Sequence, residues 1–422
     1  MGRTSVNMPY SPNDELVRDY AELQLRRHVL ILEGEEAQPL DQLEDQMSEL
    51  WENLDDISRQ RLNGMASDLN WIRRKGQPAP KARPAEMVAT EERKELLATR
   101  MQEDWPKFLH FLRICAPSIP TVNLAYLRAG AYDASGLPKY AAVFYEFAAE
   151  CDPANAAIGV IALRTLDRVN HAAALTRAAQ IVASPLSVPP VVVALSIVML
   201  LRRDEVEGVA VDRQGYEEIL QEAIERLGLE PPSDVGQAMT FQLAASAFEI
   251  LGDSASALRC YEAGLKLSPD NELLLVGKGM ALYGIQTNKA VAAFQRVVSN
   301  EGSSLVWPYF FLAHHSLLQQ NYAESLRMGK LARERATSNV VRAELLGWQA
   351  ICLSESGYPA DVVRPLFERA LLLDPANERL QRNLTAFTES LSTDEQLLWD
   401  MASEDSLRSD KAPKMSELEP VA

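Results

Sequence analysis

Residues 238–271 restrict the fold of this chain most, because they predict two amphipathic helices joined by a tight turn. Phe241, Ala245 and Phe248 recur at the helical period, so they share one face of a first helix. Gly252 follows as a residue that tolerates a positive φ, and Asp253 supplies a carboxylate that can cap the next helix. The pattern indicates a helical hairpin whose two inner faces contact each other.

Small residues in this segment allow the two helix axes to approach closely, while aromatic residues fill the space beside the contact. The positions that carry the pattern are Phe241, Ala244, Ala245, Phe248, Ala257, Tyr261, Gly264 and Pro269. In spacing and residue type they resemble the tetratricopeptide repeat (TPR), a 34-residue helix-turn-helix unit. A single hairpin cannot bury its outer faces, so the resemblance implies further repeats on both sides.

Segments before and after the central one repeat the pattern with varying fidelity. The predicted hairpins are residues 122–155, 156–187, 189–232, 272–300, 306–337 and 343–376, followed by a closing helix at 377–391. Residues 122–155 match almost as well as the central segment, and 189–232 predict a stretched hairpin with a long loop near 205–213. The predicted fold class is therefore all-α: a right-handed, TPR-like superhelical solenoid over residues 122–391 with an N-terminal helical region.

For the N-terminal region, residues 1–75, the sequence predicts a helical bundle or a coiled-coil-like segment. Apolar residues at helical spacing indicate a first helix near residues 13–33, and two more helices that meet near 55–58. Whether these apolar stripes pack within the chain or form a dimerising coiled coil stays open. Homo-oligomerisation through the N-terminal helices is accordingly one alternative.

Three further boundaries follow from composition. Residues 76–86 contain three prolines and no large apolar side chain, which predicts an extended linker. Residues 87–121 predict a connecting helix in which Pro106 marks a break or kink. Residues 392–422 are dominated by acidic and small residues, which predicts a disordered tail.

The charge balance bears on the class of partner. Acidic residues outnumber basic ones 59 to 42, for a formal net charge of −17, which argues against nucleic acid and anionic membranes as partners. The longest apolar run, residues 191–201, is too short to span a bilayer, which requires ~20 residues. We see no signal peptide and therefore expect a cytoplasmic protein without direct membrane insertion. Four cysteines without paired spacing suggest buried thiols rather than disulfides or a zinc site.

No catalytic motif is recognisable in the sequence. It contains no phosphate-binding GxxxxGK loop, no GxSxG nucleophile elbow and no HExxH zinc helix. His314 and His315 are adjacent, so on a helix they point about 100° apart and cannot share a metal as an i, i+4 pair can. We therefore predict no enzyme activity, no catalytic residue, no metal site and no cofactor.

The TPR resemblance does imply a partner-binding groove. In TPR proteins the first helix of each unit lines the concave surface, where its second, fifth and ninth positions face the groove. The candidate groove residues on this register are Trp307, Phe310, His314, Leu273, Val276, Met280 and Gln242. Two alternatives stay open: the register slips by one residue, or the N-terminal helices of the chain fill the groove.

The resemblance thus implies an adaptor or assembly scaffold that binds a protein or peptide segment through the concave face of the array. Repeats that hold acidic chaperone C-termini place lysine, asparagine and arginine at the groove positions, and this chain does not. The alternative function is a regulatory or catalytic subunit. In that case the activity lies in the N-terminal helices and the repeats serve only for docking.

Overall fold

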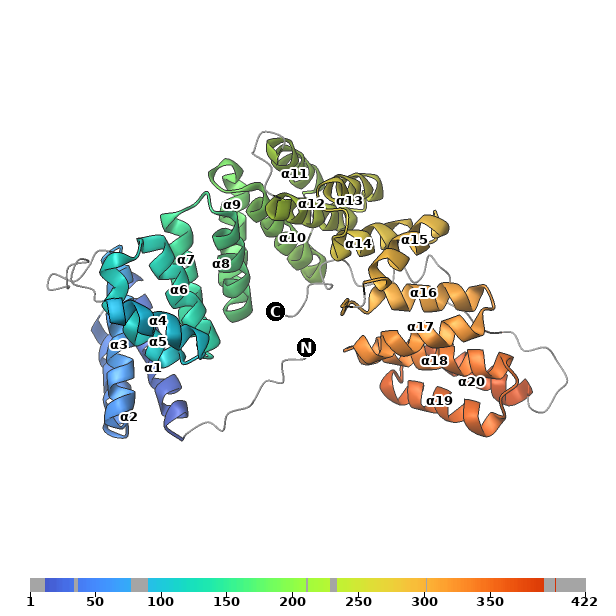
Figure 1. The fold of residues 1–422 in the computed structure, drawn as a ribbon, viewed down its shortest axis with the longest axis horizontal. Helices are drawn as coiled ribbons and strands as arrows, with labels where there is room; N and C mark the ends of the chain where they lie inside the picture. The colour runs from blue at the N-terminus through green and yellow to red at the C-terminus, as the bar shows by residue number, and fades with distance from the viewer. Residues whose placement is uncertain are drawn as a thin grey trace. The chain divides into compact units, whose positions relative to one another are not determined.

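The computed structural model describes residues 12–33, 37–76, 90–209, 212–227, 234–300, 302–390 and 399. Every regular element within these ranges is helical, and none of these ranges contains a β-strand. The chain divides into two compact units, Met1–Val192 and Val193–Ala422. The helices are labelled along the ribbon in Figure 1. The prediction of an all-α fold is confirmed.

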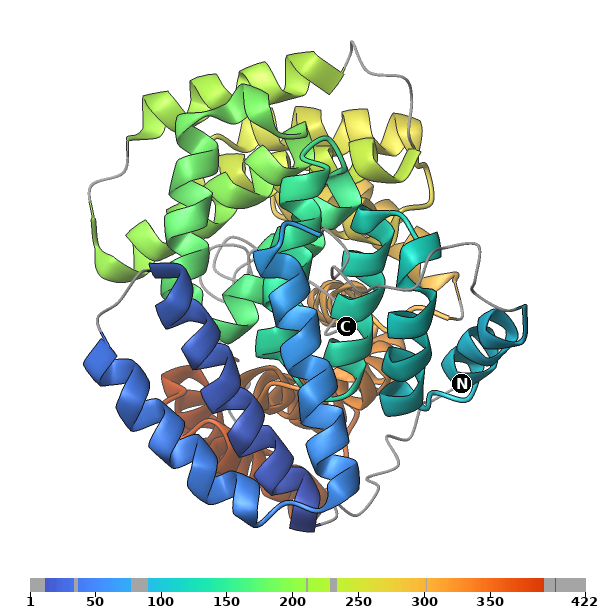
Figure 2. The ribbon, with the colours of Figure 1, turned by 90° about the vertical axis from the view of Figure 1, so that its left-hand side faces the viewer.

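The first unit combines the N-terminal helices with the first hairpins of the array. Its helices are α1 (Pro12–Glu33), α2 (Ala37–Glu52), α3 (Asp56–Arg73), α4 (Thr90–Met101), α5 (Trp105–Cys115), α6 (Thr121–Ala134), α7 (Pro138–Cys151), α8 (Ala156–Val169) and α9 (His171–Ala183). Figure 2 shows α1 lying between α2 and α3, in agreement with its packing against both. The hairpins are the α6–α7 and α8–α9 pairs, whose helices pack on each other.

The second unit continues the array of hairpins. Its helices are α10 (Pro190–Glu207), which spans the division at Val192, α11 (Arg213–Leu227), α12 (Asp234–Leu251), α13 (Ser254–Leu267), α14 (Glu272–Leu282), α15 (Thr287–Val298), α16 (Trp307–Leu318), α17 (Tyr322–Arg335), α18 (Asn339–Glu355), α19 (Ala360–Leu373) and α20 (Glu378–Ser390). Consecutive helices from α11 to α20 pack against each other, so the predicted stack of two-helix units is present.

The central hairpin, α12 and α13, has the structure that its sequence predicts. Gly252 ends α12 with φ of +82°, a conformation that costs glycine little. The carboxylate of Asp253 accepts a hydrogen bond from the backbone N–H of Ser256 at 3.0 Å and so caps α13. Ala257 and Tyr261 are completely buried in the contact between the two helices.

Two glycines permit the close approach of α14 to its neighbours. A Cβ atom added at Gly277 would lie 2.4 Å from the ring of Tyr261, and one at Gly279 would lie 2.4 Å from the ring of Phe294. Real Cβ atoms do not come this close to other carbon atoms, because van der Waals repulsion rises steeply there. The tight packing between repeats therefore depends on these two positions.

The connecting segment breaks earlier than predicted. The expected break was Pro106, but the helical path already ends at α4 and resumes at α5, with Glu103 between them at φ of +57°. Asp104 caps α5 by accepting a hydrogen bond from the N–H of Lys107 at 3.3 Å. Pro106 then occupies the first turn of α5, where its missing N–H removes no helical hydrogen bond.

One hydrophobic core joins the N-terminal helices to the first hairpins. It includes Leu62 of α3, Leu112 of α5, Phe144 of α7 and Ala162 of α8. A domain boundary is predicted at residues 76–86, whereas the core includes residues on both sides of that segment. Residues 77–89, which contain nearly all of the predicted linker, lie outside the described residues.

Two predictions concern smaller features. Of the predicted tail 392–422 only Trp399 is described, and its indole stacks with Phe367 and Phe387 and donates to Glu355 Oε1 at 2.6 Å. The expectation of buried thiols is correct for three cysteines and wrong for Cys151, which is exposed near the end of α7. No described helix is long and apolar enough to cross a membrane.

Candidate partner-binding cleft in the N-terminal helices

The predicted groove residues lie in the second unit, and most of them are buried. The exposed fractions are 8% for Trp307, 2% for Phe310, 0% for His314, 0% for Val276, 6% for Met280 and 8% for Gln242. Only Leu273 is partly exposed. Trp307, Phe310 and His314 share one face of α16, Leu273, Val276 and Met280 belong to α14, and Gln242 belongs to α12.

Packing between repeats accounts for this burial. The rings of Phe310 and His314 lie 4.6 and 5.1 Å from the indole of Trp348 on α18. On the other side, the hydroxyl of Tyr283 lies 2.9 Å from Nδ1 of His314. Inter-repeat contacts thus explain the apolar character that suggested a docking surface. That these residues contact a partner stays a prediction.

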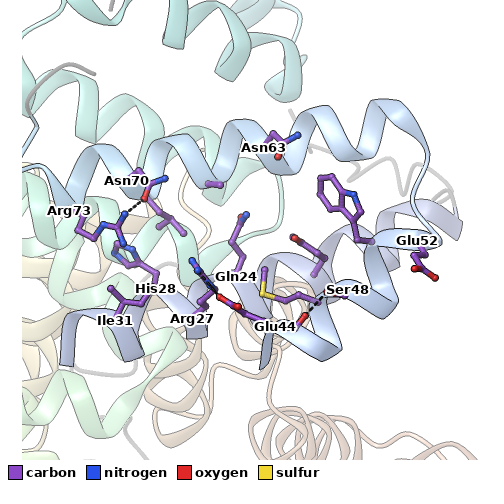
Figure 3. A pocket seen from close by; sticks show the side chains of 15 residues that line it. Gln24, Arg27, His28, Ile31, Glu44, Ser48, Glu52, Asn63, Asn70 and Arg73 are labelled. Atoms are coloured by element: carbon purple, nitrogen blue, oxygen red, sulfur yellow. Dashed lines mark hydrogen bonds and ion pairs between the residues drawn. The ribbon is translucent and has the colours of Figure 1, made fainter. Parts of the chain in front are cut away.

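An open cleft lies instead within the first unit, among α1, α2 and α3. Its volume is about 570 Å³, which is in the range of sites that bind small molecules or short peptide segments. Helix α1 packs against both α2 and α3, and the cleft occupies the space that these three helices leave between them. Figure 3 shows the side chains that line it. We call it the α1–α3 cleft.

Aromatic packing fixes one end of the α1–α3 cleft. The rings of Tyr20 on α1 and Trp51 on α2 lie 5.3 Å apart. Arg59 at the start of α3 donates from Nε and Nη2 to the carbonyl oxygen of Trp51 at 3.2 and 3.1 Å, and its guanidinium lies over the indole ring. These contacts hold the turn between α2 and α3 and keep the two aromatic side chains in place.

Polar side chains that contact one another line the middle of the cleft. Arg27 on α1 pairs with Glu44 on α2 at 2.7 Å. Gln24 donates to the carbonyl of Leu62 at 3.3 Å and accepts from the hydroxyl of Tyr140 at 2.9 Å, so its amide is already engaged. The exposed Arg27–Glu44 pair contributes at most about 1 kcal/mol to stability and can exchange partners when a ligand enters.

The wall formed by α3 presents amide side chains to the cleft. Asn63, Ala66, Asn70 and Arg73 recur at helical spacing, so they share one face of α3. Arg73 donates from Nη2 to Oδ1 of Asn70 at 2.7 Å, which leaves the amide N–H groups of Asn70 to act as donors. Ala66 lies between the two asparagines, and its small side chain leaves space in front of this face of α3.

His28 provides a buried polar group beside the same cleft. Its side chain is 6% exposed, and Nε2 is buried with no hydrogen-bond partner among the described residues. Burial, and to a smaller degree the charge of Arg73, lowers the pKa of His28, so the imidazole is neutral at neutral pH. A buried polar atom without a partner costs free energy, which a ligand supplying a hydrogen bond would recover.

The α1–α3 cleft was not predicted from the sequence. The spacing of Asn63 and Asn70 on one helix face was available in the sequence. The sequence could not show that α1, α2 and α3 leave an open space between them.

No family model matches this chain, and no characterised protein sequence matches it. The fold is TPR-like. A TPR protein from Parabacteroides merdae is 14% identical, covering 61% of this chain and 97% of that one with a TM-score of 0.39. The TPR2AB domain of yeast Sti1, in complex with pHSP90, is 14% identical, covering 66% and 97% with a TM-score of 0.23.

A third solved structure, the C-terminal part of a TPR protein from Cytophaga hutchinsonii, is 12% identical, covering 68% of this chain and 98% of that one with a TM-score of 0.29. At such values no partner or residue role transfers to the present chain. The TPR-like description rests on its own hairpins, such as α12–α13 with its capped turn and buried small residues.

Proposed function

We propose that this chain is a protein-binding scaffold and that the α1–α3 cleft receives an extended segment of the partner. The observation that carries the proposal is the combination, in one cleft of about 570 Å³, of a partnerless buried His28 Nε2 with a row of amide side chains on α3. The hairpins α6–α7 and α8–α9 of the same unit support this cleft through the hydrophobic core that they share with α1 and α3, and the array offers further docking surface.

The spacing of the asparagines fits the main chain of a peptide. Asn63 and Asn70 are seven residues apart, which on an α-helix corresponds to about 10 Å. An extended peptide advances about 3.3 Å per residue, so the two amides meet peptide groups about three residues apart. The amide of Asn63 offers both a donor and an acceptor, which is what a peptide group requires, and Asn70 offers its N–H groups.

The remaining lining suits side chains of such a segment. Tyr20 and Trp51 form an aromatic end that can receive an apolar side chain, and the N–H groups of Arg73 and Asn70 can meet an acceptor at the other end. Aromatic and arginine side chains dominate the energetics of protein interfaces, because they combine a large contact area with directed polar groups.

The proposal assigns binding rather than catalysis to the N-terminal helices. Ser48, the hydroxyl of the cleft, donates to the carbonyl of Glu44 at 2.9 Å and is therefore not directed at His28 as an activated nucleophile would be. Docking along the concave face of the array, with the predicted groove residues as its contacts, stays a second hypothesis.

Filling the cleft tests this proposal. Ala66→Trp places an indole between the two asparagines and should remove a specific set of proteins from those captured by the full chain in native lysate. Ala172→Trp, the same change at an exposed position on α9, is the matched control and should retain the set. Identical captured proteins for both variants, with both melting as the wild type does, would exclude the cleft as the binding site.

A further inference from the structure

A second cleft in the first unit lies on the opposite side of α3. It is bounded by α3, α5 and the turn between α6 and α7, and its volume is about 390 Å³. We call it the α3–α5 cleft. It shares no lining residue with the α1–α3 cleft, so the two can be altered independently.

The base of the α3–α5 cleft rests on a buried charge cluster. Asp68 is completely buried, and its Oδ2 accepts hydrogen bonds from Arg113 Nε at 3.0 Å, from Arg113 Nη2 at 2.9 Å and from the hydroxyl of Tyr132 at 2.6 Å. Arg128 Nη2 lies 3.1 Å from the other carboxylate oxygen, and its guanidinium stacks over Trp71. One carboxylate thus faces two guanidinium groups.

The cluster therefore carries one unit of positive charge more than its carboxylate neutralises. Burial and the negative charge of Asp68 raise the pKa of Tyr132 well above its ordinary value, so the phenol stays neutral and adds no negative charge. Nε and Nη1 of Arg128 have no hydrogen-bond partner among the described residues. Surplus charge in a low-dielectric environment attracts a counter-ion much more strongly than the same charge in water.

Arg113 connects this surplus charge to the cleft. Its side chain is 21% exposed and lines the cleft together with Arg61 of α3 and Lys107 of α5. The twelve lining residues include His110 and Gln60 but no aspartate or glutamate. Asp104 caps α5, Asp133 pairs with Arg168 at 2.5 Å, and Asp56 lies 3.8 Å from Arg59. In a chain of net charge −17, this cleft is a locally cationic site.

Gly64 helps to hold Arg113 in this position. A Cβ atom at residue 64 would lie 2.4 Å from Nη1 of Arg113, so the guanidinium packs directly against the glycine. Because Asp68 and Tyr132 hold the same guanidinium from the other side, it cannot move away freely. The arginine is therefore already oriented before a ligand binds, which lowers the entropic cost of binding.

We propose that the α3–α5 cleft binds a phosphate monoester. The net charge of the buried cluster together with Arg61 and Lys107 matches a dianion better than a single carboxylate. Lys107 and Arg113, both on α5, can each meet one terminal oxygen of a tetrahedral phosphoryl group, and Arg61 of α3 adds positive charge to the same cleft. Ile57, which is 80% exposed, Leu109 and Leu137 supply an apolar side for the organic group of the ester.

Phenyl phosphate is a suitable probe because it combines the dianion with an apolar group. The full chain should bind it at constant ionic strength, as followed by calorimetry and by 31P line broadening, and should bind benzoate, the matched monoanion, much more weakly. Lys107→Gln should weaken binding roughly tenfold, as loss of a charge-assisted contact does. Lys94→Gln, which removes an exposed lysine on α4, should leave binding unchanged.

Gly64→Ala provides a second variant, because it displaces Arg113 without removing its charge, and it should weaken phenyl phosphate binding as well. Lys107 is exposed, so its replacement does not disturb folding. Lys107→Gln therefore tests phosphate binding even if Gly64→Ala is unstable. Three results would overturn the proposal: no binding of phenyl phosphate at millimolar concentration, equal binding of benzoate, or equal affinities of Lys107→Gln and Lys94→Gln.

Discussion

The hydroxyl group of Tyr283 lies 2.9 Å from Nδ1 of His314, and both side chains are completely buried in the second unit. His314 in turn packs against Trp348, so Tyr283 at the C-cap of α14, His314 on α16 and Trp348 on α18 form one layer of side chains. The predicted groove residue His314 therefore packs between repeats. Replacement of such buried residues should affect stability first.

Truncation of the aromatic residues on α16 tests this assignment. Trp307→Ala and Phe310→Ala should each lower the free energy of unfolding by about 3–5 kcal/mol, because the first leaves a cavity beside Phe311 and the second leaves one beside Trp348. Leu372→Ala, at a side chain that is 82% exposed, should change it by less than about 0.5 kcal/mol. Urea denaturation measures all three, and equal midpoints for all of them would show that Trp307 and Phe310 are not core residues.

Two glycines of the second unit allow a matched test of the repeat packing. Gly279→Ala should destabilise the chain by about 1–3 kcal/mol, because the new methyl group would lie 2.4 Å from the ring of Phe294. At Gly329 the nearest atoms lie 4.0 Å away, so Gly329→Ala should be neutral or stabilising by up to about 1 kcal/mol. Thermal melting compares the two variants. An unchanged melting temperature for Gly279→Ala would contradict the close approach of α14 and α15.

The lowered pKa of His28 predicts a pH dependence of stability. A histidine whose folded pKa lies below its unfolded value stabilises the folded state above the unfolded pKa, and this stability is lost as the pH falls. The wild-type chain should therefore lose melting temperature between about pH 7.5 and pH 5.5, and His28→Asn should lose less. The control His110→Asn removes an exposed histidine. Parallel curves for wild type and His28→Asn would contradict the burial of His28.

The thiols should differ sharply in reactivity. Burial raises the pKa of Cys260 to about 12, and Cys115 and Cys352 are buried as well, whereas Cys151 is exposed. A thiol reagent such as DTNB needs an accessible thiolate. Because partial burial and the charge of Glu150 also raise the pKa of Cys151, one equivalent should react fast only at alkaline pH, and the other thiols should react only on unfolding. Cys151→Ser should remove the fast phase. Fast labelling of two or more thiols in Cys151→Ser would contradict the described packing.

The repeat architecture was predictable because its signals are local. Gly252, Asp253, Ala257 and Tyr261 lie within one turn and one helix, and each has a conformational or packing role that residue type alone reveals. The same reasoning identified the meeting point of α2 and α3, where Asp55 accepts a hydrogen bond from the N–H of Ser58 at 2.7 Å.

The candidate sites were not predictable because their contacts are not local. Asp68 and Arg113 are separated by 45 positions, and no periodic pattern connects them. On α16 the spacing placed Trp307, Phe310 and His314 on one face correctly. It could not show that Trp348 of the following repeat covers that face, because helical periodicity describes one helix and not its neighbour.

The central claim, that a partner segment occupies the α1–α3 cleft, is tested most directly by photo-crosslinking in the native cell. A p-benzoylphenylalanine replacing Asn63, which is exposed on the wall of the cleft, should form a covalent adduct with a specific partner protein. The same residue replacing Leu372, which is exposed in the second unit, should not form that adduct. Absence of any protein adduct from position 63, or the same adducts from both positions, would contradict the claim.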